Sequence, residues 1–200
     1  MKKILLLFLL HFLYCLYSVN CKAQTIQYKQ LLDSAIKSKN LFVGSGPISK
    51  IRLDKNDIRE NYSDLKEVCK NVDTFTLFQI IDNFKTIDTT FWTDDELDKV
   101  ILIQNRDQNI SSKNILQKFN TTDKKKIRFY RKQVNDYNRC APIDRDICYY
   151  SRPVFDNSRQ IAIIEWDKGH SQLGGGGGII IYKLSNGIWN NIGILTRWNY

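Results

Sequence analysis

The stretch that decides the fold is residues 179–195, IIIYKLSNGIWNNIGIL, in which two apolar runs flank the dipeptide Asn186-Gly187. Asn and Gly both tolerate a positive φ, and a type I′ turn needs a positive φ at each of its two central positions. The stretch therefore predicts a β-hairpin, with strands at about 179–184 and 188–195.

Two further strands are expected before this hairpin. Residues 149–155 are rich in apolar and aromatic side chains, and Pro153 within them predicts an edge or a bulge, because proline cannot donate a backbone hydrogen bond. Residues 161–164 are apolar on both faces of the strand, which is typical of a central position. The carboxyl part therefore predicts a four-stranded antiparallel meander with Trp189 and Ile180 in its core.

The preceding sequence favours helices over about 25–140. Apolar residues recur at loosely helical spacing over 25–38, whereas 74–84 fits a helix or a strand. Thr93 and Glu96 have the spacing of a capping box, in which each side chain hydrogen-bonds to the other residue's backbone N–H. This pair predicts the start of a helix.

The expected fold class is α+β, with a mainly helical N-terminal part packed on a C-terminal four-stranded antiparallel β-meander over about 149–198. The chain has 200 residues, of which 42% are hydrophobic and 26% charged. These values are close to the averages for globular proteins and exclude a disordered chain or a multi-span membrane protein. No linker or repeat divides 24–200, so we expect a single domain.

The amino terminus predicts export. Two lysines precede a nearly unbroken apolar run over 4–17, and small residues lead to Ala23. This pattern is typical of a secretory signal peptide spanning 1–23, with cleavage after Ala23 and no transmembrane span left. Lipid attachment at Cys21 is the weaker alternative, because the residues before it depart from the lipoprotein pattern. The protein is then expected in the periplasm, at the cell surface or outside the cell.

An oxidising compartment favours disulfides. Cys140 and Cys148 flank a short loop, and we predict that they pair with each other. Cys69 would then be the odd cysteine, either a small buried apolar residue or a reactive thiol. No metal site is expected, since the sequence has no Cys-x-x-Cys motif and His170 is the only histidine after the leader. No cofactor is expected either.

One enzymatic alternative rests on three residues near the third strand. Glu165 and Asp167 share one strand face, and His170 follows in an expected loop. A carboxylate that orients an imidazole is the minimum for general acid–base catalysis. The alternative hypothesis is therefore a small hydrolase that uses His170 with Glu165 or Asp167. The neighbouring Ser171 lacks the context of an activated nucleophile. A solvated loop histidine is the simpler interpretation.

The run of five glycines at 174–178 has two interpretations. Bare backbone amides can bind an anion, which makes Gly175, Gly176 and Gly177 binding candidates. However, the run leads into an apolar strand rather than into the helix that a phosphate loop needs. A pliable connection or bulge between strands is the expected structure.

Positive charge is concentrated in one segment. The chain carries a net charge of +9, and the part after the leader has 27 basic and 21 acidic residues, hence +6. Residues 113–139 alone contain nine basic and two acidic residues, so the remainder is slightly acidic. A helix over 124–137 would place an apolar stripe on one side and basic side chains on the other. The basic candidates for binding are Lys124, Lys125, Arg128, Arg131 and Lys132.

This basic stripe has a structural and a functional interpretation. It is either the solvated outer face of a packed helix or a surface that attracts an acidic protein, a glycan or the cell envelope. Nucleic acid is disfavoured as a partner because no recognised nucleic-acid-binding motif accompanies the charge.

Residues 124–200 resemble a closing module of exported bacterial proteins of unknown function. The resemblance rests on Phe129-Tyr130, Ser151-Arg152-Pro153-Val154-Phe155, Ala162, the glycine run, Tyr182-Lys183, Asn186-Gly187 with Trp189, and Trp198. The resemblance implies a small α+β unit on secreted or envelope proteins, and it does not indicate any particular activity. The leading functional expectation is a non-enzymatic binding or interaction protein; the hydrolase and the polyanion binder are the alternatives.

Overall fold

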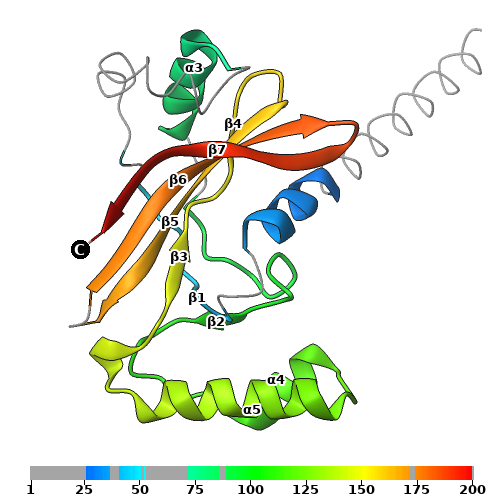
Figure 1. The fold of residues 1–200 in the computed structure, drawn as a ribbon, viewed down its shortest axis with the longest axis vertical. Coiled ribbons are helices and arrows are strands. Elements are labelled where there is room, and N and C mark those ends of the chain that lie inside the picture. The colour runs from blue at the N-terminus through cyan, green and yellow to red at the C-terminus, as the bar shows by residue number, and fades with distance from the viewer. Residues whose placement is uncertain are drawn as a thin grey trace, which may run out of the picture.

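The computed structural model describes residues 26–36, 41–50, 52, 72–85, 89–171 and 174–199, with the backbone alone at 169–171. The expected signal peptide and Cys69 lie outside this part of the chain. Within it, seven strands form one sheet in the order β2-β1-β3-β5-β6-β7, and β4 also pairs with β5 (Figure 1). The strands are β1 (Phe42–Gly44), β2 (Ile101–Ile103), β3 (Cys148–Tyr150), β4 (Val154–Phe155), β5 (Ile161–Ser171), β6 (Gly174–Ser185) and β7 (Ile188–Asn199).

The expected four-stranded antiparallel meander is wrong, because the sheet is larger and mixed. Strands β1 and β2 come from the part expected to be helical, and they pair in parallel, with Phe42 opposite Ile101. Strand β1 also pairs in parallel with β3, where Val43 lies opposite Cys148. Both Val43 and Cys148 are buried. Short apolar runs of this kind gain stability by covering the exposed edge of a longer sheet, which the local sequence pattern does not reveal.

The antiparallel part follows the expected hairpin. Strands β5, β6 and β7 pair antiparallel, with register shifts between Lys168 and Ser171 in β5 and at Ile179–Tyr182 in β6. The turn between β6 and β7 has φ values of 51° at Asn186 and 76° at Gly187, as a type I′ turn requires. Trp189 is buried, as expected, and Ile180 is half-buried. The expected first strand is interrupted at Pro153, which separates β3 from β4.

The glycine run is a strand rather than a connection. Residues 174–178 form the first part of β6, and aromatic side chains from its two neighbours cover the bare backbone. A Cβ added at Gly177 would lie 2.4 Å from the Trp198 ring and 2.5 Å from the carbonyl oxygen of Trp166. At Gly178 it would lie 3.2 Å from the Trp166 Nε1 atom. The glycines therefore make room for tryptophans that supply the apolar contacts that glycine lacks.

The helices are residues 26–35, α3 (Thr74–Phe84), α4 (Ser112–Phe119), α5 (Lys124–Arg139) and the short 3-10 turn η1 (Pro142–Asp144). Helices expected at 25–38 and 124–137 are thus confirmed, and 74–84 is a helix. Asp73 caps α3, since its carboxylate accepts a hydrogen bond of 2.7 Å from the N–H of Thr76.

The capping pair forms without the helix it predicts. The Thr93 N–H donates to Glu96 Oε2 at 3.0 Å, and the Glu96 N–H donates to Thr93 Oγ1 at 3.4 Å. The chain then passes through turns into β2. The Glu96 carboxylate also binds Arg152, and this tertiary contact holds the segment as a turn.

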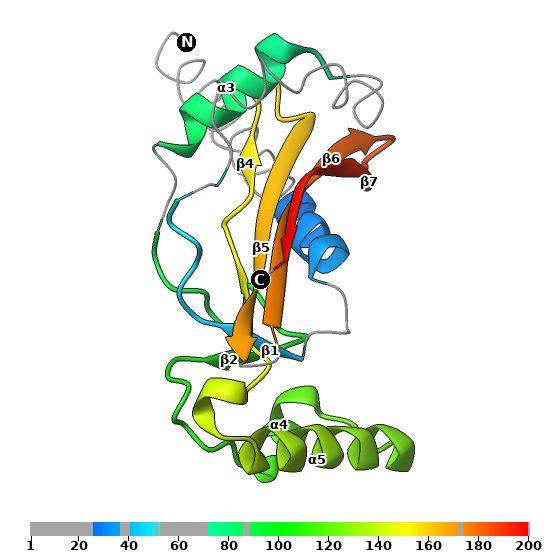
Figure 2. The same cartoon turned by 60° about the vertical axis from the view of Figure 1, so that its left-hand side comes forward.

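Three clusters of buried apolar side chains surround the sheet. Helix α3 packs on one face, and the helix at 26–35 packs on the other. The α4–α5 pair packs across one end of the sheet, near β1 and β2, as a separate layer (Figure 2). This arrangement buries one side of α5 and leaves its opposite side facing solvent.

Candidate functional site

The apolar stripe expected on α5 is confirmed. Val134 and Tyr137 are buried, and Tyr130 is half-buried. The Tyr137 ring lies 4.5 Å from that of Phe42 on β1, and the Tyr130 ring stacks on Phe119 of α4 at 4.4 Å. These contacts fix the rotation of α5 about its axis, so that its basic residues point outward.

The outer face of α5 carries seven exposed cations, which we call the basic face: Lys124, Lys125, Lys126, Arg128, Arg131, Lys132 and Arg139. None of them forms an ion pair within the part of the chain that the structure describes. The helix has no acidic residue in its first turn. Instead, the Asp123 cap accepts the N–H groups of Lys125 and Lys126, which offsets the unfavourable interaction of three lysines with the helix dipole.

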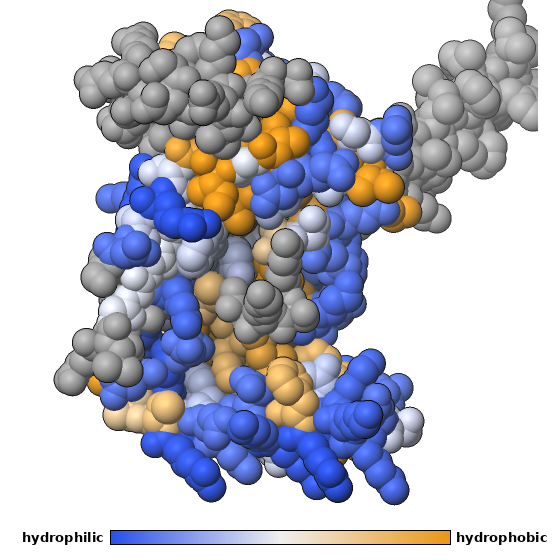
Figure 3. Space-filling view, viewed as in Figure 1, coloured by the Kyte–Doolittle hydropathy of each residue, from blue (hydrophilic) through white to orange (hydrophobic). Residues whose placement is uncertain are grey.

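The basic face forms a row along the helix. Residues four and three positions apart lie on the same side, so Lys124, Arg128, Arg131 and Lys132 follow one another toward Arg139. At a rise of 1.5 Å per residue the row is about 22 Å long. Figure 3 shows hydrophilic side chains along the outer edge of the α4–α5 layer, below a more apolar area.

Many cations elsewhere in the described chain have carboxylate partners. The pairs are Lys29–Asp98, Lys85–Asp82, Lys99–Asp33, Lys118–Asp94, Lys168–Asp146, Arg52–Asp167 and Arg152–Glu96. The basic face therefore differs from these cations because none of its members is paired with a carboxylate in the described structure, although Asp123 and Asp136 lie on or next to the same helix.

The structure brings Glu165 and Asp167 together with a residue that the sequence did not single out. The Arg52 guanidinium lies 2.9 Å from Asp167 Oδ2, and its backbone N–H donates to Glu165 Oε2 at 2.8 Å. The Arg52 guanidinium also stacks on Trp198 at 4.6 Å. No local sequence signal links Arg52 to a strand more than a hundred residues later.

Burial governs the chemistry of this carboxylate pair. The Glu165 side chain is 1% exposed, and burial raises its pKa to about 7 against the opposing effect of Arg52. A carboxyl group so enclosed cannot touch a substrate from solvent. His170 belongs to strand β5 rather than to a loop, but its side chain and that of Ser171 lie outside the described structure. Among the described side chains, the charged group that meets Glu165 and Asp167 is that of Arg52.

Cys140 and Cys148 are free thiols in the structure. Cys140 is exposed at the end of α5, whereas Cys148 is buried in β3, and burial raises the pKa of the Cys148 thiol to about 11. The disulfide between them stays a prediction.

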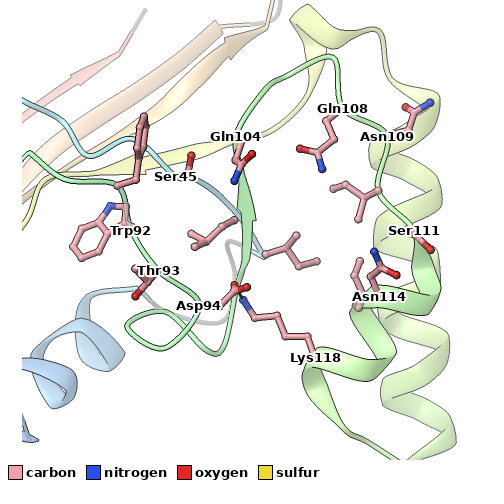
Figure 4. A pocket seen from close by; sticks show the side chains of 15 residues that line it. Ser45, Trp92, Thr93, Asp94, Gln104, Gln108, Asn109, Ser111, Asn114 and Lys118 are labelled. Carbon is pink, nitrogen blue, oxygen red and sulfur yellow. Dashed lines mark hydrogen bonds and ion pairs between the residues drawn. The ribbon is translucent and has the colours of Figure 1, made fainter.

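A cleft of about 1000 Å³ separates β2 from α4, and no local sequence pattern predicts it. One wall is formed by β2 and the segment 91–94, and the other by 108–111 and α4 (Figure 4). The lining side chains are mostly amides, hydroxyls and isoleucines: Ser45, Phe91, Trp92, Thr93, Asp94, Ile101, Leu102, Gln104, Gln108, Asn109, Ile110, Ser111, Asn114, Ile115 and Lys118.

Across the described ranges, no three His, Cys, Asp or Glu side chains gather into a group that could hold a metal ion. None of the described helices is long and apolar enough to span a bilayer. Comparison with known proteins gave no matching family model, no similar curated protein and no similar solved structure. The site must therefore be interpreted from its own geometry.

Proposed function

We propose that this protein is a non-enzymatic binding protein of the cell envelope, and that it holds a linear anionic polymer, such as an acidic glycan, on the basic face of α5. The observation that carries the proposal is the basic face, whose seven exposed cations have no carboxylate partners in the described structure. Like charges on neighbouring helix turns repel one another, so this arrangement costs stability that a bound polyanion would restore.

The shape of the row favours a linear polymer. The cations follow a single helix over about 22 Å, which suits a chain with regularly spaced anionic groups. Each cation that neutralises such a group releases a counterion, so the affinity depends strongly on salt concentration. Phe129 is 49% exposed on the same helix and adds an aromatic surface beside the charges.

The hydrolase alternative has weaker support. Glu165 is enclosed by the sheet and held by Arg52. Asp167 is engaged by the same guanidinium. We interpret this cluster as structural.

Retention on immobilised heparin, a linear sulfated glycan, tests the proposal. The chain from Gln24 onward should elute only at raised salt. The triple variant Arg128→Gln, Arg131→Gln, Lys132→Gln should elute at lower salt, and the slope of log affinity against log salt should fall by about 3 in magnitude.

A matched control removes the same charge elsewhere. Lys50→Gln, Lys183→Gln and Arg197→Gln lie away from α5, and together they lower the net charge equally. This control should elute close to the wild-type protein. Equal losses in the two triple variants would show that overall charge, and not the basic face, drives retention, and would contradict the proposal.

Export is part of the proposal and has its own test. Expression of the full chain in a bacterial host, followed by mass spectrometry of the envelope and medium fractions, should give a mature protein that begins at Gln24. A protein that keeps Met1 and stays in the cytoplasm would contradict the envelope location.

A further inference from the structure

The cleft between β2 and α4 is lined by three carboxamide side chains that have no hydrogen-bond partner among the described residues. The side-chain carboxamides of Gln104, Gln108 and Asn114 make no hydrogen bond to any described residue. Figure 4 shows Gln104 and Gln108 reaching into the cleft from opposite walls. Each carboxamide has two donors and one acceptor, so this pair suits a ligand whose groups both donate and accept.

The described lining of the cleft has no net charge. Lys118 from α4 and Asp94 from the opposite wall form an ion pair, and Lys118 Nζ also donates to the Leu97 carbonyl at 3.4 Å. They are the only ionised side chains among the described lining residues. A phosphate or carboxylate ligand would find no unpaired cation among the described lining residues, so the cleft favours an uncharged ligand.

An aromatic ring lies at one side of the cleft. Phe91 is 71% exposed, although its neighbour Trp92 is buried. A Cβ added at Gly46 would lie 3.4 Å from the Phe91 ring, so the ring rests against the backbone at Gly46. A large apolar ring held against the backbone and open to solvent is a surface on which the C–H face of a sugar ring can stack.

The outer edge of β2, which no described strand pairs with, adds one further pair of polar groups. The Ile101 N–H donates to Leu41 and the Ile103 carbonyl accepts from Ser45, so both residues face β1. Backbone groups alternate along a strand, and the N–H and C=O of Leu102 therefore face away from β1. One residue is too short an edge to hold a peptide as an added strand, but it can hydrogen-bond to a hydroxyl group.

We infer that this cleft binds a short neutral saccharide. Gln104, Gln108 and Asn114 hydrogen-bond to its hydroxyl groups, and Phe91 stacks on one sugar ring. A volume of about 1000 Å³ is at the upper end of ordinary ligand pockets and accommodates more than one sugar ring. The inference does not depend on the basic face, because α5 contributes no described residue to the cleft.

The test is a panel of maltotriose, cellotriose, chitotriose and mannotriose, titrated by calorimetry and by protein-observed NMR with the chain from Gln24 onward. At least one trisaccharide should bind saturably. The double variant Gln104→Ala, Gln108→Ala and the single variant Phe91→Ala should each weaken that binding tenfold or more.

Two matched controls sit outside the cleft. Phe75→Ala removes an aromatic ring of nearly equal exposure, 69%, from α3, and Gln160→Ala removes an exposed carboxamide before β5. Both should bind like the wild-type protein. Thermal unfolding of all variants checks that the fold is intact, since each replaced side chain is exposed.

Several outcomes would overturn the inference. These are no binding of any of the four sugars, binding that the cleft variants leave unchanged, or cleft resonances that respond to an extended peptide and not to a sugar. The basic-face triple variant should bind the sugar normally, and the cleft variants should bind heparin normally. Failure of the saccharide inference is thereby distinguishable from failure of the proposed function.

Discussion

Arg152 Nη1 lies 2.5 Å from Glu96 Oε1, which joins the turn before β2 to the connection between β3 and β4. Arg152 is only 7% exposed and stacks on Trp92 at 4.3 Å. Its guanidinium also donates to the Thr90 and Phe91 carbonyls at 3.1 and 3.2 Å. Burial alone would raise the pKa of Glu96, but the hydrogen bonds from Arg152 and Thr93 hold it below its usual value. One side chain thus anchors a segment that has no regular secondary structure.

Replacing Arg152 should destabilise the protein strongly. Arg152→Ala removes one donor from each of the Thr90 and Phe91 carbonyls and from the Glu96 carboxylate, together with a stacked side chain, which should cost about 3 kcal/mol or more. Urea unfolding measures the loss. The control Arg159→Ala removes an exposed guanidinium that stacks on Phe155, and it should cost about 0.5 kcal/mol or less. Equal effects of the two substitutions would show that Arg152 is not the anchor.

Stability should depend on the ionisation of Glu165. Burial raises the pKa of Glu165 to about 7 in the folded protein, whereas a glutamate exposed to water in the unfolded chain has the ordinary pKa of 4.5. The folded state therefore binds more protons between these pH values, and unfolding free energy should fall as pH rises from about 4.5 to about 7. Arg52 and Asp167 are the charged neighbours that set this balance.

The variant Glu165→Gln should remove this pH dependence, and at pH 8 it should exceed the wild-type protein in stability by about 2–3 kcal/mol. Urea unfolding from pH 4.5 to 8 checks both statements. Asp107→Asn, at an exposed position, should keep the wild-type profile. A variant profile parallel to that of the wild-type protein would contradict the assignment to Glu165.

The glycines of β6 should tolerate alanine very unequally. Gly177→Ala places a methyl group 2.5 Å from the Trp166 carbonyl oxygen, and backbone cannot move aside, so we expect a loss of about 3 kcal/mol. Gly187 has open space around it, and its φ of +76° is the only obstacle. Gly187→Ala should therefore cost about 1 kcal/mol. Thermal unfolding should rank the two variants in this order.

Cys140 and Cys148 should differ in their reactivity toward an alkylating reagent. In the reduced protein, iodoacetamide at pH 8 should modify exposed Cys140 rapidly, whereas buried Cys148 should react only after unfolding. Mass spectrometry of peptides locates the label. In the exported protein the predicted disulfide would protect both residues until reduction; rapid labelling of Cys140 without reductant would exclude the disulfide.

Features with local causes could be predicted from the sequence. The turn at Asn186-Gly187 depends on two adjacent backbone conformations, and the orientation of α5 depends on an apolar stripe within sixteen residues. The basic candidates on α5 could be identified for the same reason.

Features with distant causes could not be predicted. Strands β1 and β2 have three residues each, and their partners lie far along the chain. The glycines at 174–178 read as a loop until Trp166 and Trp198 are placed over them. Thr93 and Glu96 make their expected hydrogen bonds, yet Arg152 turns the segment away from a helix. The cleft and the position of Arg52 are likewise products of the tertiary fold.

The parallel pairing of Val43 with Cys148 has a consequence for any shortened form of this protein. An excised fragment containing residues 124–200 would leave one side of β3 bare and Arg152 without Glu96, with the apolar stripe of α5 missing its contact to Phe42. Such a fragment would expose a strand edge and a hydrophobic surface together, the combination that promotes aggregation. We therefore expect that residues 124–200 depend on β1 and β2 for a stable fold and do not fold independently.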